Sequence, residues 1–147
     1  MVQEELVRAR LRLLEGYMSD LRNLTGTTPS EYKENLVLRR YAERTLHLAI
    51  EACLDIGYHI ISSEGYREPR YGRDVITILA ENGWLDSDTA SRLQGMAGFR
   101  NILVHDYATI ELVAVLNIIN TRVPDMAMFT SSIVRRLDDQ GTEQGAG

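Results

Sequence analysis

The chain has 147 residues, 44% of them hydrophobic and 25% charged, which is typical of one globular domain with its own core. Its net charge of −5 disfavours a protein that coats nucleic acid nonspecifically, although it leaves room for a localised nucleic-acid site. The single cysteine, Cys53, cannot form an intramolecular disulfide, so the fold does not depend on an oxidising compartment.

Neither the N-terminus nor the apolar stretches indicate export or membrane insertion. Residues 1–5 include two acids, where a secretory signal peptide would carry basic and then apolar residues. No stretch approaches the roughly 20 apolar residues that a membrane span needs. We therefore expect a cytoplasmic protein that makes no membrane contact.

The first expected helix covers about residues 2–22 and is broken by Asn-Leu-Thr-Gly at residues 23–26. Apolar residues recur in it at helical spacing, which predicts a buried face. That face would consist of Leu6, Leu13, Leu14, Tyr17 and Leu21.

A strong helix start follows. Thr28 can cap, Pro29 suits the first helical position, and Glu31 completes a capping box. One long helix is expected to extend from there to about residue 62. Apolar residues spaced alternately by four and three predict an internal helix of a bundle. They are Leu38, Ala42, Leu46, Ala49, Cys53, Ile56 and Ile60.

The clearest internal loop covers residues 63–72, which contain two glycines and a proline. A short helix is expected over about residues 74–82, closed by Gly83. Asp86 or Ser87 is then expected to cap the next helix.

The last helical stretch opens near residue 109. Pro124 either kinks it or starts a new helix that ends near Leu137. We expect residues 1–137 to form one all-α domain and the polar, Gly-rich residues 138–147 to form a disordered tail.

Several familiar chemistries have no counterpart in the sequence. There is no Gly-rich phosphate loop and no Cys-x-x-Cys pair. A di-iron bundle would need Glu-x-x-His motifs from two helices, and the nearest pair, Glu43 and His47, is spaced by four and occurs once. We therefore expect no metal site and no cofactor.

Two glycines interrupt the helical pattern near residue 97. Gly95 and Gly98 each cost about 1 kcal/mol relative to alanine inside a helix. We attribute them to the close packing of a neighbouring helix, which would also suit a site formed where two helices meet.

Four polar side chains follow within eight positions: Arg100, Asn101, His105 and Tyr107. Asn101 and His105 are one turn apart on the same helix face, and a long arginine side chain can bend toward the same pocket. An arginine that neutralises a phosphorane and a histidine that moves a proton can perform phosphodiester chemistry without a metal. Such spacing also arises by chance, so the spacing alone leaves catalysis open.

The segment Arg100-Asn-Ile-Leu-Val-His105-Asp-Tyr107 resembles the motif of HEPN domains, and a tyrosine two places after the histidine resembles the HepT toxin branch. Residues 39–61 are similar to the long second helix of that family, and residues 74–85 and 115–129 also fit. The resemblance covers about residues 2–137.

This resemblance implies an antiparallel helical bundle of about five to six helices that forms a homodimer, so that two motif copies face one cleft. It implies the toxin of a HEPN/MNT toxin–antitoxin system, a metal-independent endoribonuclease that cleaves RNA, with Arg100, Asn101 and His105 as catalytic residues. It also implies a cognate minimal nucleotidyltransferase (MNT) antitoxin that transfers AMP onto Tyr107. The added phosphodiester would compete for Arg100, and the adenosine would fill the site.

Two other groups of residues allow more than one interpretation. The polar helix face with Arg44, His47 and Glu51 either lines the same cleft or forms an ion-pair ladder. Aromatic residues and arginines alternate at residues 66–73, a composition able to stack bases and hold phosphates but equally typical of a polar loop. Trp84 is expected in the core.

Two other functions stay open. One is a non-catalytic HEPN binding module that forms a complex with a nucleotidyltransferase partner. The other is a structural helical dimer in which the motif is a buried network. Cleavage of RNA by the purified, unmodified protein distinguishes the ribonuclease from both.

Overall fold

The computed structural model describes residues 2–105 and 112–146, and the side chains of residues 2–98 and 114–141. Over the described residues the chain forms six helices and no strand, which confirms the predicted all-α class. The helices are α1 (Glu4–Asn23), α2 (Pro29–Glu34), α3 (Leu36–Glu64), α4 (Gly72–Glu81), α5 (Ser87–His105) and α6 (Leu112–Ala146). Within that part of the chain, no helix combines the length and the apolar character that crossing a membrane requires.

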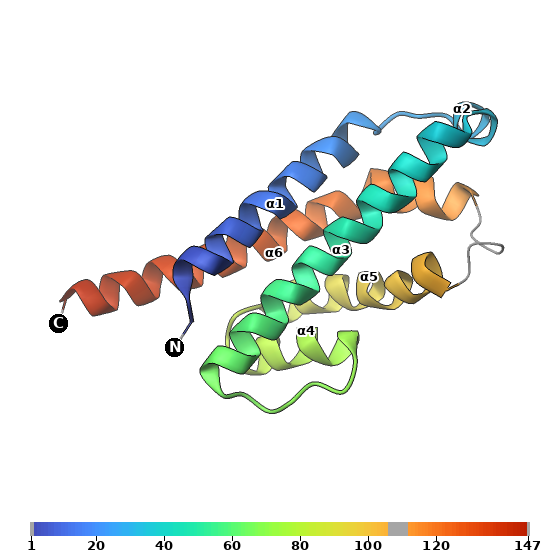
Figure 1. Cartoon of the computed structure of the whole chain (residues 1–147). Helices are drawn as coiled ribbons and strands as arrows, with labels where there is room; N and C mark the ends of the chain where they lie inside the picture. The colour runs from blue at the N-terminus through green and yellow to red at the C-terminus, as the bar shows by residue number, and fades with distance from the viewer. Residues whose placement is uncertain (1, 106–111, 147) are drawn as a thin grey trace.

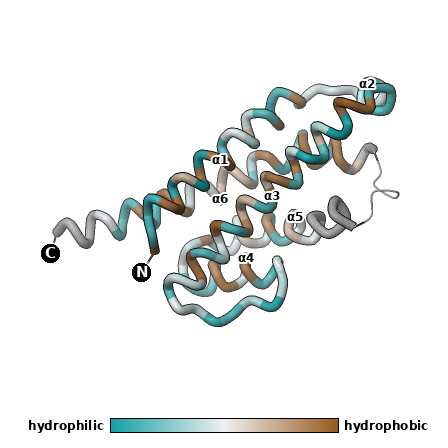
Figure 2. Tube along the Cα trace, viewed as in Figure 1, coloured by the Kyte–Doolittle hydropathy of each residue, from teal (hydrophilic) through white to brown (hydrophobic). Residues whose placement is uncertain are grey.

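Helix α3 is the centre of the bundle, because it packs against each of the other five helices. In Figure 1, α1 and α6 lie along one side of α3, while α4 and α5 lie on the other. Helix α1 runs antiparallel to α3, and α4 runs antiparallel to α5. Figure 2 shows that the loop between α3 and α4 is hydrophilic, whereas α4 itself is largely hydrophobic.

The buried face of α1 differs from the predicted one. The core residues of α1 are Val7, Leu11, Leu14, Met18 and Leu21. Leu6 and Leu13, expected in the core, are 37% and 59% exposed. Of the predicted face, Leu14 and Leu21 are confirmed as buried, and only Leu6 and Leu13 were wrong. The reason is that α1 carries two adjacent apolar stripes: one is buried in the core, and the one with Leu6 and Leu13 remains largely exposed.

The predicted capping box is confirmed, but it begins a shorter helix than expected. The Thr28 hydroxyl accepts from the Glu31 amide at 3.1 Å, and the Glu31 carboxylate accepts from the Thr28 amide at 3.4 Å. Helix α2 ends at Glu34, and the side chain of the next residue, Asn35, accepts a hydrogen bond from the amide of Leu38 at 3.0 Å. Asparagine is a strong N-cap, so a second helix starts there, and the prediction of one continuous helix was wrong.

The predicted seam of α3 is buried from Ala42 to Ile60, and Leu38 is half-buried. Burial raises the pKa of the Cys53 thiol to about 12, which keeps this thiol protonated and unreactive. The helix ends at Gly65, which adopts the left-handed conformation (φ 71°), and the amide of Tyr66 then donates to the carbonyl of Ile61.

The turn between α4 and α5 is built around Trp84, which is 2% exposed as the sequence predicted. Its indole nitrogen donates to the Tyr66 hydroxyl at 3.0 Å, and the Arg136 guanidinium lies 5.0 Å from the ring centre. The carboxylate of Asp86 accepts from the amide of Thr89 at 2.7 Å, so Asp86 is the cap of α5.

Helix α6 runs without interruption through Pro124. Pro124 therefore does not start a new helix. We expected a disordered tail from residue 138, but the helix continues to Ala146. The Asp138 carboxylate accepts from Arg8 of α1 at 2.7 Å, a partner 130 residues away that the sequence pattern does not reveal.

Candidate functional site

The predicted motif lies at the C-terminal end of α5. Arg100 and Asn101 stand in the last turns of this helix, and His105 is its final residue. A histidine at that end meets the negative end of the helix dipole, as expected from the sequence. The side chains of these three residues are outside the described part of the structure, and Tyr107 lies outside the described residues altogether.

Helix α5 is held in the bundle by a buried face of Ala90, Leu93, Met96 and Ala97. It packs against α3, α4 and α6. On the α4 side, the Gln94 amide donates to the Thr77 hydroxyl at 2.8 Å. The motif is thus carried by a helix that is anchored on three sides.

The two glycines of α5 face arginine side chains. A Cβ atom at position 98 would lie 2.5 Å from Nη2, 3.1 Å from Nε and 3.2 Å from Cζ of Arg73. A Cβ atom at position 95 would lie 3.8 Å from Nη2 of Arg122. Helices α4 and α6 do pack against α5 here, as expected, and the tight contact at Gly98 is made by the guanidinium of Arg73, whereas the contact at Gly95 is an ordinary one.

A buried carboxylate pairs with Arg122, the arginine that approaches Gly95. The Asp125 side chain in α6 is 3% exposed, and its oxygens lie 3.2 Å from Nη1 of Arg122 and 3.6 Å from Nη1 of Arg92. Because Arg92 belongs to α5, this carboxylate ties α5 to α6 next to Gly95. The sequence pattern did not predict this cluster, whose only signal is an acid within the apolar run of residues 123–129.

The polar face of α3 forms the predicted ladder. Nη1 of Arg44 lies 3.2 Å from Nδ1 of His47, and Nε2 of His47 lies 3.3 Å from the Glu51 carboxylate. Arginine can only donate, so Nδ1 accepts, and the ring proton is on Nε2, which donates to Glu51. The structure brings these three residues together in this way.

In the segment that leads into α4, the first residues have side-chain partners and the last ones are exposed to solvent. The Arg67 guanidinium binds the carboxylates of Asp74 and Glu81 at 2.9–3.1 Å, and this hydrogen bonding lowers the pKa of both carboxyl groups. The Tyr66 hydroxyl accepts a hydrogen bond from the indole nitrogen of Trp84. The residues that follow, Arg70, Tyr71 and Arg73, are exposed, with Tyr71 at 62%.

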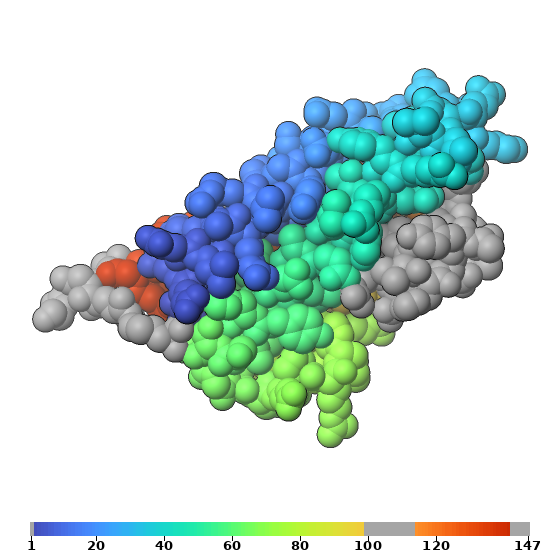
Figure 3. Space-filling view, in the orientation of Figure 1, coloured from blue at the N-terminus to red at the C-terminus, as the bar shows by residue number. Residues whose placement is uncertain are grey.

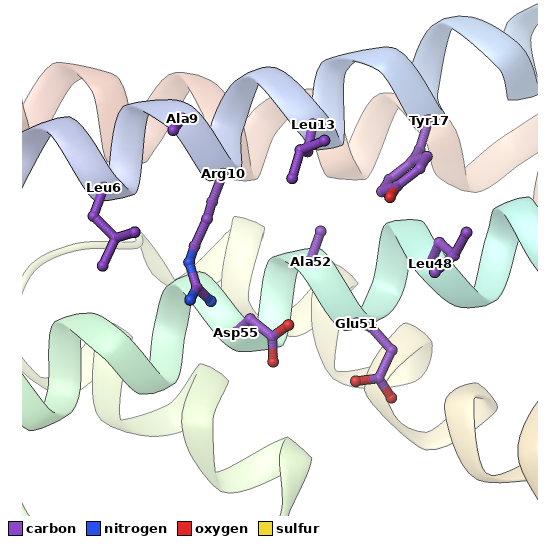
Figure 4. Close-up of a pocket in the computed structure, with 9 residues that line it drawn as sticks. All are labelled: Leu6, Ala9, Arg10, Leu13, Tyr17, Leu48, Glu51, Ala52 and Asp55. Carbon is purple, nitrogen blue, oxygen red and sulfur yellow. The ribbon is translucent and has the colours of Figure 1, made fainter.

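A groove of about 460 Å³ lies between α1 and α3 and is lined mainly by apolar side chains. In Figure 4, Leu6, Leu13 and Tyr17 of α1 point toward α3, and Glu51 and Asp55 stand on the opposite side. The exposed apolar stripe that we had expected in the core is thus one wall of this groove. Its apolar character does not suit a phosphate.

Among the side chains that the structure describes, no three histidine, cysteine or acidic residues are grouped closely enough to hold a metal ion.

Comparisons with known proteins agree with the geometry. Residues 14–133 match the family described as Ribonuclease HepT-like. The chain is 32% identical over 104 residues to the mRNA nuclease HepT of Shewanella oneidensis, covering 71% of this chain and 78% of that protein. It is 24% identical over 110 residues to the tRNA nuclease HepT of Aphanizomenon flos-aquae, covering 75% of each.

The fold is similar to that of a solved toxin–antitoxin complex. The tri-AMPylated HEPN toxin of Shewanella oneidensis, in complex with its MNT antitoxin, superposes with a TM-score of 0.80 at 26% identity. The superposition covers 92% of this chain and 99% of that toxin.

Proposed function

Because this chain belongs to the Ribonuclease HepT-like family, we propose that it is a toxin that cleaves RNA without a metal ion and that a nucleotidyltransferase antitoxin silences by AMPylation. Family membership confirms the predicted HepT-type HEPN domain and its ribonuclease class. The observation that carries the proposal is the position of Arg100 and His105 at the end of a well-anchored α5.

In the proposed reaction His105 takes the proton from a ribose 2′-hydroxyl, and the 2′-oxygen attacks the adjacent phosphorus. The bond from phosphorus to the 5′-oxygen breaks as the new bond forms, and the 5′-oxygen receives a proton. Arg100 neutralises the charge on the phosphorane oxygens, and Asn101 orients them by hydrogen bonding. The products are a 2′,3′-cyclic phosphate and a 5′-hydroxyl.

The protein is proposed to act as a homodimer in the cytoplasm. One histidine per motif supplies half of an acid–base pair, and a second copy facing the same cleft supplies the other half. The ladder of Arg44, His47 and Glu51 is proposed to line this cleft, since its ordered imidazole and cation can contact RNA backbone. Sedimentation at micromolar concentration tests the dimer, and a monomer that still cleaves RNA would contradict it.

The decisive experiment is cleavage of RNA by the purified, unmodified protein in the presence of EDTA. We expect cleavage to persist in EDTA and to be lost in Arg100→Ala and His105→Ala, with helical content unchanged. No cleavage of either mRNA or tRNA by the wild type would instead favour a non-catalytic module that binds a nucleotidyltransferase. The relatives are named for both RNA classes, so both substrates belong in the assay.

The proposed regulation places AMP on Tyr107. The phenol oxygen attacks the α-phosphorus of ATP, pyrophosphate leaves, and the new phosphodiester competes for Arg100. Intact mass after co-expression with the antitoxin should show AMP increments, which Tyr107→Phe should abolish. If Tyr107→Phe is still modified and silenced, the acceptor is another residue.

A further inference from the structure

The contact between the Arg73 guanidinium and α5 suits Arg73 to binding the RNA substrate. Arg73 is the second residue of α4, and its guanidinium lies against the Cα of Gly98. Three of its atoms would be within 3.2 Å of a Cβ at that position, so only glycine leaves room for the group as it lies. A glycine inside a helix lowers stability, which needs a compensating reason.

The register of the two helices points this arginine toward the motif. Thr77 of α4 is bonded to Gln94 of α5, and Arg73 lies on Gly98, so the helices run antiparallel. The N-terminal end of α4 therefore lies beside the part of α5 that leads to Arg100 (Figure 1). Position 98 also shares a helix face with positions 101 and 105, and position 105 is about 10 Å further along the axis.

Arg73 has no acidic partner among the side chains that the structure describes. Within the described residues, no carboxylate lies within 4 Å of its guanidinium, whereas Arg67 in the same loop binds two carboxylates. A cation in the first turn of a helix also opposes the helix dipole. A guanidinium held in this unfavourable place, with no carboxylate partner among the described residues, is suited to an external anion.

The neighbouring residues extend this surface. Arg70 and the 62%-exposed Tyr71 immediately precede α4. Figure 3 shows the segment that leads into α4, in lime green, projecting from the body of the molecule. An arginine that binds phosphate next to an aromatic ring that can stack on a base is a common arrangement for single-stranded RNA. In a protein with a net charge of −5, such a local group is needed to attract RNA.

We propose that Arg73, seated on Gly98, binds a backbone phosphate of the RNA strand next to the one that is cleaved. This proposal rests on the proposed ribonuclease function and adds a substrate-binding residue outside the motif. It also explains Gly98, which serves as the seat of a guanidinium.

The test measures binding of a fluorescein-labelled, single-stranded 2′-O-methyl RNA, which lacks the free 2′-hydroxyl and is not cleaved. Arg73→Gln should weaken binding about tenfold and reduce the slope of log K against log salt by about one. Arg73→Lys should keep the salt slope. Gly98→Ala should weaken binding to a similar degree, because the methyl group displaces the guanidinium while the helix gains propensity.

Two variants are matched controls. Gly95→Ala makes the same change one turn earlier, where a Cβ meets only an ordinary contact at 3.8 Å. Arg12→Gln removes the same charge from an exposed position on α1. Both should bind the probe within about twofold of the wild type, and both glycine variants should melt at or above the wild-type temperature.

The outcomes separate this inference from the function on which it rests. If wild type cleaves RNA and Arg73→Gln binds the probe with unchanged affinity and salt slope, the inference is wrong and the function stands. If wild type binds the probe through Arg73 but cleaves no RNA, the ribonuclease proposal fails and the binding site stands. Failure of the wild type to bind the probe overturns the inference as well.

Discussion

Two arginines approach glycines of α5, closely at Gly98 and at ordinary distance at Gly95, and the two arrangements differ in what neutralises the charge. At Gly95, Arg122 shares the buried carboxylate of Asp125 with Arg92, and the group ties α5 to α6. At Gly98, Arg73 has no such carboxylate among the described residues and remains open to solvent. The arginine near Gly95 thus serves packing, and the arginine against Gly98, as we propose, serves RNA binding.

The largest expected effect is that of Asp125→Asn, which removes the charge shared by two arginines. Breaking a buried ion pair costs several kcal/mol, but both arginines are about half-exposed, so we expect a loss of about 2 kcal/mol and a melting temperature lower by about 6 °C. Thermal denaturation measures it. Asp88→Asn, at a 69%-exposed partner of Arg92, is the control and should change stability by less than about 0.5 kcal/mol. An unchanged melting temperature in Asp125→Asn would show that the ion pairs of Asp125 do not stabilise the packing of α5 on α6.

Gly57→Ala shows what a close contact costs when the neighbour cannot move. A Cβ at position 57 would collide with Val75 and lie 3.3 Å from Leu79, both fully buried. Overpacking outweighs the gain in helix propensity, so we expect a net loss of about 1–1.5 kcal/mol by chemical denaturation.

The matched control for Gly57→Ala is Gly16→Ala on α1, where a Cβ meets nothing within 4 Å. That variant should be as stable as the wild type or more stable. If Gly57→Ala were tolerated equally well, the distinction between a hydrocarbon neighbour and a flexible guanidinium would not hold.

Arg122→Gln and Arg73→Gln should have opposite consequences. We expect Arg122→Gln to lower the free energy of unfolding by roughly 0.5–1 kcal/mol, because its side chain is 42% exposed, and to leave RNA binding unchanged. Arg73→Gln should leave stability nearly unchanged and weaken RNA binding. Urea denaturation and probe binding, measured on both variants, decide the matter. If both variants changed stability and RNA binding in the same way, the two arginines would not have the separate roles described here.

The smallest expected effect concerns Arg67, the neutralised counterpart of Arg73 within one loop. Arg67 lowers the pKa of Asp74 and Glu81, so this contribution to stability is complete above their ordinary values of 3.8 and 4.5. It is lost as the pH falls through the lowered pKa values. In carboxyl NMR titrations, Arg67→Gln should move both midpoints upward, while Arg73→Gln should leave them in place. Unchanged midpoints in Arg67→Gln would show that the pairing does not persist in solution.

Local signals predicted well where one short segment decides the outcome. The Thr28 capping box, the seam of α3 and the position of the motif at the end of α5 were all confirmed. Caps depend on residues within three or four positions, and a single apolar stripe specifies one buried face. In α1, which carries two stripes, the periodicity was ambiguous, and packing against α3 and α6 chose Val7 and Met18 over Leu6 and Leu13.

The sequence by itself determined the helical class, the family and the segment that carries the motif, because these depend on spacing along the chain. Only the tertiary structure decided which side chains approach the glycines of α5. The partner of Gly98 is 25 positions away in α4, and the partner of Gly95 is 27 positions away in α6. No local pattern relates such residues, since antiparallel packing alone brings a guanidinium against a helix backbone.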